Sequence, residues 1–235
     1  MDYLILMSSI VLGAFSVFWL KLDQPRHIKL LNTFTGAFLL SLTFLHLLPE
    51  LYETSKGNFT IIGILILVGF YVQVALEGIS QGIEHGHSHH VHGGLPFGIM
   101  AGLCLHALIE AMALGNADSY HDPASRRLLL WSIVLHNYPV SIALLGMLLH
   151  SGLSRGKALG GLAVFAAMAP LGMLISGHSI LAHYSRELMA VVIGIFMHIA
   201  TTILFEAEDG HRIHLRKVVA ILVGTGLGVL TVFFE

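Results

Sequence analysis

Long apolar segments joined by short loops are the feature that most restricts what this chain can fold into. A helix needs about 20 mostly apolar residues to cross a bilayer, and eight segments are of about that length. They run near 3–20, 29–51, 60–83, 95–116, 125–150, 158–177, 187–205 and 217–234. Charged residues make up only 11% of the chain, against roughly 25% in ordinary globular domains. We therefore predict an all-α membrane protein, an eight-transmembrane-helix bundle that forms a single domain over residues 1–235.

The distribution of Lys and Arg predicts how these spans are oriented, because cytoplasmic loops carry an excess of both residues. Alternate loops divide the twelve basic residues into a set of eight and a set of four. The larger set is Lys21, Arg26, Lys29, Arg155, Lys157, Arg212, Arg216 and Lys217; the smaller is Lys56, Arg126, Arg127 and Arg186. We expect the larger set to be cytoplasmic. Both termini then lie outside, in a multi-pass protein of the plasma (inner) membrane.

Histidine is unusually abundant, with sixteen residues against twelve Lys and Arg. The net charge of -2 provides no basic patch for nucleic acid, whereas the excess of imidazole indicates metal ions or protons. The ionisable residues within the spans are acids and histidines: His46, Glu50, Glu77, His106, Glu110, His136 and His198. A path with carboxylates and imidazoles but no fixed positive charge suits a cation, and it favours zinc or iron over sodium or calcium.

Two of the spans carry a histidine near the middle of the membrane. His106 and Glu110 are four residues apart and share one helix face, where they can hold a metal or simply bond to each other. His136 lies just before Pro139, which removes a backbone N–H and kinks a helix. Such a kink can expose carbonyl oxygens beside the histidine or be purely structural. Because both spans have a central histidine, we predict a metal site in Pro-kinked helices.

Polar residues toward the span ends are candidates for the transport pathway. His46 and Glu50 lie at the outer end of the second span, and Glu77 lies nearer the inside in the third. His198 and Glu206 belong to the seventh span, with Glu206 at its inner end. Ordinary snorkelling to the interface explains Glu50 and Glu206 about equally well. Glu77 is equally explained as a structural acid that bonds to neighbouring polar side chains of its own span.

The loop between the third and fourth spans, at about 84–94, contains five histidines within eight residues: His85, His87, His89, His90 and His92. Such clustering indicates metal affinity, and the glycines and serine between the histidines predict a flexible, cytoplasmic, metal-collecting loop. A pH sensor is the alternative, because clustered imidazoles titrate near neutrality.

Taken in order, these motifs resemble the ZIP (Zrt/Irt-like protein) family of zinc and iron transporters, over nearly the whole chain. The resemblance rests on HLLPE at 46–50, HxxxE at 106–110, H-N-x-P from His136 and APLG at 169–172, together with the histidine-rich loop. It implies a metal site between the fourth and fifth spans with His106, Glu110 and His136 as ligands. It also implies a homodimer.

Several positions depart from the family pattern. Ala107 and Ala111 replace a polar residue and a glycine that are common beside the histidine and the acid. Val140 stands where many members have a carboxylate for a second metal, and Ala169 stands where some have Glu. We therefore predict one metal ion rather than two, with Asn137 as an optional oxygen ligand.

The predicted function is a divalent metal transporter that moves Zn²⁺ into the cytoplasm, with Fe²⁺, Mn²⁺ and Cd²⁺ as further candidate substrates. Three protein ligands with an open position also describe catalytic zinc, so an intramembrane zinc-dependent hydrolase is the alternative, and a metal sensor without transport is a third. The sequence contains no HExxH, GxSxG or Walker A motif, and no evident base accompanies the histidines. We therefore expect the chain not to be an enzyme.

Overall fold

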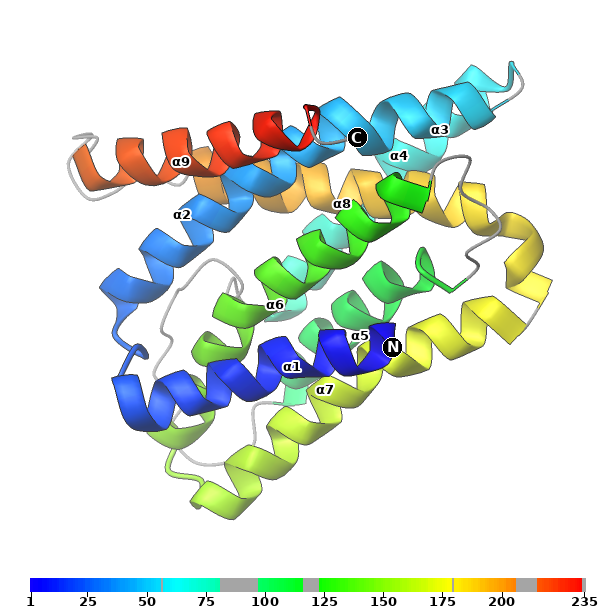
Figure 1. Ribbon diagram of the computed structural model, residues 1–235. Helices are drawn as coiled ribbons and strands as arrows, with labels where there is room; N and C mark the ends of the chain where they lie inside the picture. Colours follow the sequence, from blue (N-terminus) through cyan, green and yellow to red (C-terminus); the bar gives the residue numbers. More distant parts are fainter. Residues whose placement is uncertain (56, 81–96, 116–122, 179, 206–214, 234–235) are drawn as a thin grey trace.

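The structure is a computed structural model, and it describes residues 1–55, 57–80, 97–115, 123–178, 180–205 and 215–233. All regular secondary structure in these ranges is helical (Figure 1). The helices are α1 (Asp2–Phe15), α2 (Pro25–Leu42), α3 (Leu48–Thr54), α4 (Phe59–Ser80), α5 (Phe97–Met112), α6 (Pro123–His150), α7 (Arg155–His178), α8 (Ser185–Phe205) and α9 (Leu215–Thr231). The all-α prediction is thus confirmed for the described part of the chain.

Short π-helical segments extend two of these helices, so that the described elements form eight rods. The segment η1 (Ser16–Leu20) continues α1, and η2 (Thr43–Leu47) joins α2 to α3. A short 3₁₀ segment, η5 (Ile180–Tyr184), precedes α8. Lys21 has a left-handed backbone (φ 51°) and ends the first rod, and Pro25 then begins α2 at a position where its missing N–H costs nothing.

Six rods are long and apolar enough to cross a membrane. These are Asp2–Leu20, Pro25–Thr54, Phe59–Ile79, Pro123–His150, Arg155–His178 and Ser185–Phe205. The described parts of the other two, α5 with 16 residues and α9 with 17, are shorter, and each begins directly after residues that the structure does not describe. At 1.5 Å per residue they extend roughly 24–26 Å, less than the hydrocarbon core of about 30 Å. The predicted count of eight spans therefore stays a prediction.

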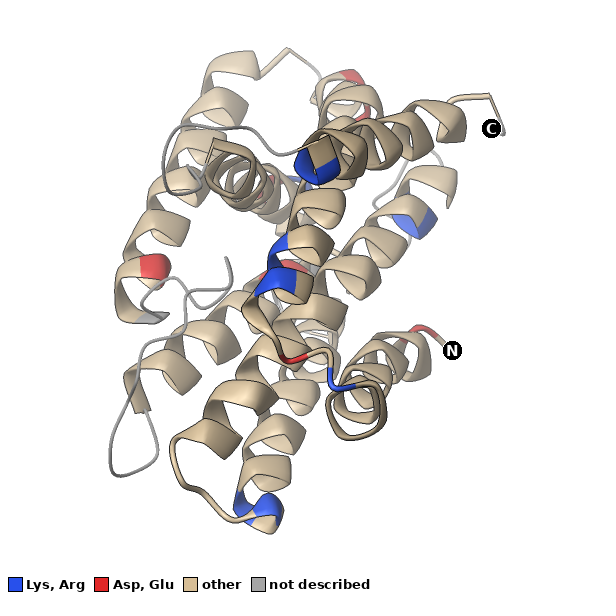
Figure 2. Cartoon of the chain, turned by 90° about the vertical axis from the view of Figure 1, so that its left-hand side faces the viewer, with Lys and Arg blue, Asp and Glu red and all other residues tan. Residues whose placement is uncertain are grey.

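The rods alternate in direction, and both chain termini lie toward the same end of the bundle (Figure 1). Arg126 at the start of α6 joins three elements at this end. Its guanidinium donates to the Asp2 carboxylate at 2.7 Å and to the Leu114 carbonyl oxygen at 2.9 Å. Few positions along the described helices are Lys, Arg, Asp or Glu (Figure 2), which suits helices that face lipid.

Helix α4 packs closely against α8 through two glycines. A Cβ atom added to Gly69 would lie 1.9 Å from the Val191 carbonyl oxygen, and one added to Gly194 would lie 1.9 Å from that of Ile66. Small residues let helix backbones approach closely in membranes. This contact sets the position of the following turns of α4, which carry the buried Gln73 and the partly buried Glu77 described below.

The substitution Gly69→Ala should destabilise the protein, because its methyl group meets backbone atoms that cannot rotate away. Overpacking of this kind costs about 1–3 kcal/mol. Gly63→Ala on the same helix is the matched control, since nothing lies within 4 Å of its added Cβ. Thermal unfolding in detergent measures the difference. A Gly69→Ala melting temperature equal to that of Gly63→Ala would contradict the described α4–α8 packing.

Two buried apolar clusters flank the middle of α5 and α6. The first includes Ala111 of α5 and Val134 of α6, together with much of α8. The second includes Leu103 of α5 and Val140 of α6, together with part of α7. The segments between these positions on α5 and α6 contain His106, Glu110 and His136. The polar side chains of the predicted metal site are therefore enclosed by apolar packing.

Candidate metal centre

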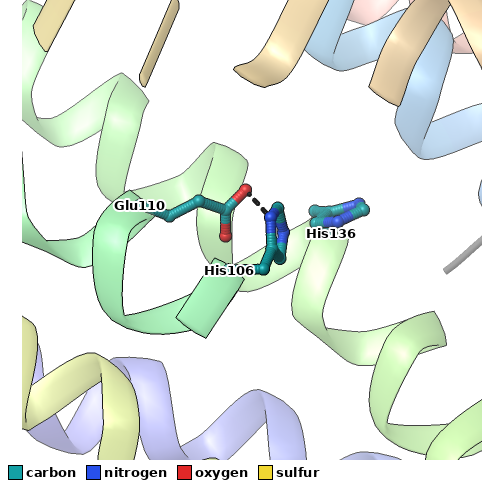
Figure 3. A group of neighbouring side chains, drawn as sticks. All are labelled: His106, Glu110 and His136. Carbon is teal, nitrogen blue, oxygen red and sulfur yellow. Dashed lines mark ion pairs between the residues drawn. The ribbon is translucent and has the colours of Figure 1, made fainter. Parts of the chain in front are cut away.

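Helices α5 and α6 bring together the three side chains that the sequence analysis predicted as metal ligands (Figure 3). His106, Glu110 and His136 each offer one ligand atom, and these atoms lie within 4.8 Å of one another. His106 Nε2 lies 3.1 Å from Glu110 Oε1, one helical turn along α5. The imidazole rings of His106 and His136 meet edge to face, with centroids 5.7 Å apart. Two imidazoles and one carboxylate thus converge from two helices.

This group is almost fully removed from the molecular surface. His106 and Glu110 are 0% exposed, and His136 is 1% exposed. Neither carboxylate oxygen of Glu110 has a hydrogen-bond partner among the described residues. A buried carboxylate is costly unless a cation or hydrogen bonds compensate it, and a bound cation would supply that compensation. By donor types and spacing, this group could hold a small dication.

The neighbourhood of His136 contains a second buried polar side chain, that of Asn137. Asn137 is 1% exposed, and neither its Oδ1 nor its Nδ2 has a hydrogen-bond partner among the described residues. Helix α6 continues on both sides of Pro139. Because proline has no N–H, the Leu135 carbonyl oxygen lacks its usual helical donor. Further oxygen atoms are therefore located close to His136 in the chain.

Val140 and Ala169 show no polar function in the structure. Each is 1% exposed, and they belong to different apolar clusters. Val140 packs in the cluster that contains Ala107, and Ala169 packs in the cluster that contains Ala111. Neither position offers an oxygen or nitrogen atom for a second ion.

A second histidine–carboxylate pair joins α4 to α8. His198 Nε2 lies 2.5 Å from Glu77 Oε2, and Thr202 Oγ1 lies 3.4 Å from the same nitrogen. The Phe70 ring packs edge to face on the His198 imidazole, with centroids 4.9 Å apart. Glu77 therefore contacts a different helix, in addition to any bond to polar neighbours in its own span.

The other predicted pathway residues that the structure describes lie on elements other than α5 and α6. His46 is buried in η2, and its Nε2 lies 2.8 Å from Thr231 Oγ1 of α9. Glu50 is buried on α3, one turn further along the rod. Glu206 lies outside the described residues, as does the whole histidine loop with His85, His87, His89, His90 and His92.

The structure adds one residue that the sequence analysis missed. Gln73 of α4 is 0% exposed, and its Oε1 lies 2.9 Å from His106 Nδ1. An amide in an apolar helix, one turn before Glu77, was the available signal. The role of Gln73 depends on the packing of α4 against α5, and the sequence pattern alone does not predict which helices are neighbours.

The sequence is similar to those of known proteins. Residues 95–231, more than half of the chain, match the family described as "ZIP Zinc transporter". Similar proteins include zinc transporter ZIP9 of Micropogonias undulatus, which is 28% identical over 65% of this chain and 54% of its own length. Zinc transporter ZIP9 of Macaca fascicularis is 31% identical over 43% of this chain and 46% of its own length.

The matched region contains α5 and α6, with all three clustered side chains. The chain spans about half the length of the curated relatives that it matches. Members of the matched family are transporters, which confirms the expectation that this chain is not an enzyme and removes the hydrolase alternative. The chain is an integral multi-pass membrane protein that belongs to the ZIP zinc transporter family.

Proposed function

We propose that this protein transports divalent metal ions, with Zn²⁺ as the main substrate, across the membrane into the cytoplasm. The observation that carries the proposal is the group of His106, Glu110 and His136, buried in the helix bundle with ligand atoms within 4.8 Å of one another. These three side chains hold the ion during its passage. Asn137 contributes an oxygen when the ion needs a further ligand.

The donor types support zinc as the substrate. Imidazole nitrogen and carboxylate oxygen suit zinc, which binds such ligands at about 2.0–2.2 Å. Three protein ligands leave one position for water, and an open position favours release over permanent retention. The relatives are described as zinc transporters. Fe²⁺, Mn²⁺ and Cd²⁺ accept the same donors and are the competitors to be tested.

Polar residues on either side of the central group form the proposed pathway. His46 and Glu50 lie toward the outer side, and Glu77 and His198 lie toward the inner side, where Glu206 would continue the series. In support, His46, Glu50 and His198 are buried although they are polar, and Glu77 is in contact with His198. Carboxylates near both mouths would concentrate cations before and after the central site.

The proposed topology has eight spans, with both termini outside the plasma (inner) membrane, in one domain over residues 1–235. The alternating directions of the rods and the common end of the two termini support it (Figure 1). The short helices α5 and α9 would cross with the help of flanking residues or local bilayer thinning. Labelling of single cysteines introduced near residues 2 and 233 with a membrane-impermeant reagent would test the side on which the ends lie.

We also propose that the functional assembly is a homodimer. Light scattering or mass photometry in lipid nanodiscs would check this stoichiometry. A monomer with full activity would contradict the homodimer but not the proposed transport site.

Uptake into sealed liposomes tests the proposed function directly. Purified protein should carry Zn²⁺ into the vesicles down an imposed zinc gradient, whereas protein-free vesicles should not. Tight zinc binding without uptake would support a membrane-bound metal sensor instead. Measurement with Fe²⁺, Mn²⁺ and Cd²⁺ in the same vesicles gives the order of preference.

The histidine loop should be dispensable for basal transport, because its position between spans would place it outside the membrane. We expect joint replacement of His85, His87, His89, His90 and His92 by Ser to alter the metal concentration that gives half-maximal uptake more than the maximal rate. Liposome uptake over a range of zinc concentrations measures both quantities. A folded variant without any transport would make the loop part of the path.

A further inference from the structure

Gln73 lies against the central histidine but belongs to a different helix from any proposed ligand. It is 0% exposed, and its Oε1 lies 2.9 Å from Nδ1 of His106 on α5. A buried amide requires hydrogen bonds to offset its removal from water, so this contact is part of what makes Gln73 acceptable within the bundle. The same contact determines which ring nitrogen of His106 carries the hydrogen.

The two nitrogens of the His106 ring have different neighbours. Nδ1 lies against the Gln73 carbonyl oxygen, whereas Nε2 lies 3.1 Å from Glu110 Oε1. A carbonyl oxygen can only accept a hydrogen bond, so Nδ1 must carry the hydrogen in this contact. In the neutral imidazole the lone pair is then on Nε2. That lone pair is directed to the side of the ring where Glu110 lies.

We propose that Gln73 is a positioning residue for metal binding, which fixes His106 as the Nδ1–H tautomer and presents Nε2 as its ligand atom. This inference rests on the proposed function. Histidines that bind metals usually donate their second ring N–H to an acceptor, and loss of that acceptor typically costs 10–100-fold in metal affinity. Gln73 supplies the acceptor from α4.

The choice of an amide matters, because Gln73 accepts a hydrogen bond without adding charge beside the site. One turn further along α4, Glu77 contacts His198 of α8 with a carboxylate. Helix α4 thus presents two acceptors, four residues apart, to histidines of two different helices. The close α4–α8 packing at Gly69 and Gly194 holds this face of α4 in place.

The experiment uses protein in which Ser replaces the five loop histidines, so that zinc binding reports on the remaining sites. Nitrogen-15 labelling of histidine, with spectra recorded on the metal-free protein in lipid nanodiscs, shows which ring nitrogen of His106 carries hydrogen. The signal is assigned by its absence in His106→Asn. Zinc affinity is measured by competition with a chelator. Gln73→Leu removes the acceptor, Gln73→Asn keeps an amide that is one methylene too short, and Gln73→Glu keeps an acceptor at full length.

We expect the Nδ1–H tautomer in the native protein and in Gln73→Glu, whose added negative charge should leave zinc affinity at least as high as in the native protein. Gln73→Leu and Gln73→Asn should lose the tautomer preference and bind zinc about 10–100-fold more weakly. If Gln73→Leu does not fold, Gln73→Asn supplies the same comparison. An Nε2–H tautomer in the native protein, or unchanged affinity and tautomer in the folded shortened variants, would overturn the inference.

These outcomes are distinguishable from failure of the proposed function. The tautomer is measured without metal and without transport, so a native protein that shows the Nδ1–H form but binds no zinc contradicts the metal site alone. Zinc binding that depends on His106 but is indifferent to Gln73 contradicts only the positioning role.

Discussion

His106→Ala and His136→Ala should each abolish most zinc uptake while leaving a folded protein in the membrane. Each substitution removes one of three protein ligands, and two remaining ligands cannot replace the hydration shell of the ion in a buried site. His106 and His136 lie between the two apolar clusters, and neither cluster includes them, so the packing within the clusters remains when either histidine is replaced. We therefore expect uptake to fall much more than stability.

The matched control is His150→Ala, which removes an exposed histidine from the end of α6, the helix that carries His136. Initial rates of zinc uptake into liposomes, normalised to the amount of folded protein, provide the measurement. Near-native uptake by either His106→Ala or His136→Ala would show that the proposed site is not on the path. A loss of uptake in His150→Ala equal to theirs would make the effect nonspecific.

Glu110→Gln should have an effect of comparable size, because it removes the only negative charge of the three-ligand group while preserving its shape. At an effective dielectric constant of about 20, a single negative charge attracts a dication about 4 Å away by roughly 8 kcal/mol before desolvation is counted. About a third of this energy equals the 2.7 kcal/mol or so that corresponds to a hundredfold change in affinity. We expect zinc affinity to fall by at least about 100-fold.

Glu53→Gln is the control for Glu110→Gln, because Glu53 is an exposed carboxylate on α3. Zinc affinity should be measured in the background without loop histidines, by competition with a chelator. Neutralising Glu110 also relieves the cost of a buried carboxylate, so Glu110→Gln should be at least as stable as the native protein without metal. Unchanged zinc affinity in Glu110→Gln would mean that the carboxylate is structural.

The local part of the candidate site was predictable from the sequence, whereas its surroundings were not. The spacing of His106 and Glu110 fixes their common helix face whatever the tertiary structure is. The proximity of His136 to this pair was predicted only because two spans carry a central histidine. The contact itself depends on the tertiary arrangement of α5 and α6. Gln73 and the Glu77–His198 contact depend on how α4 packs against α5 and α8, and helix periodicity does not specify neighbours.

The fold shows the same division between local and tertiary information. Apolar length predicted the long rods closely, since α6 runs from Pro123 to His150 where 125–150 was expected. The π-helical segments at Ser16–Leu20 and Thr43–Leu47 had no such signal. An extra residue in a turn rotates the following side chains, and a segment that is apolar on nearly all faces does not reveal that rotation.

The claim that one ion is held by His106, Glu110 and His136 is tested most directly by anomalous diffraction from zinc-loaded crystals. Data collected on either side of the zinc absorption edge, on protein without loop histidines, locate each bound ion. We predict one ion per chain between α5 and α6, about 2.0–2.2 Å from a nitrogen of His106, an oxygen of Glu110 and a nitrogen of His136. A zinc-loaded structure with no ion in contact with these side chains, or with two fully occupied ions side by side there, would contradict the account.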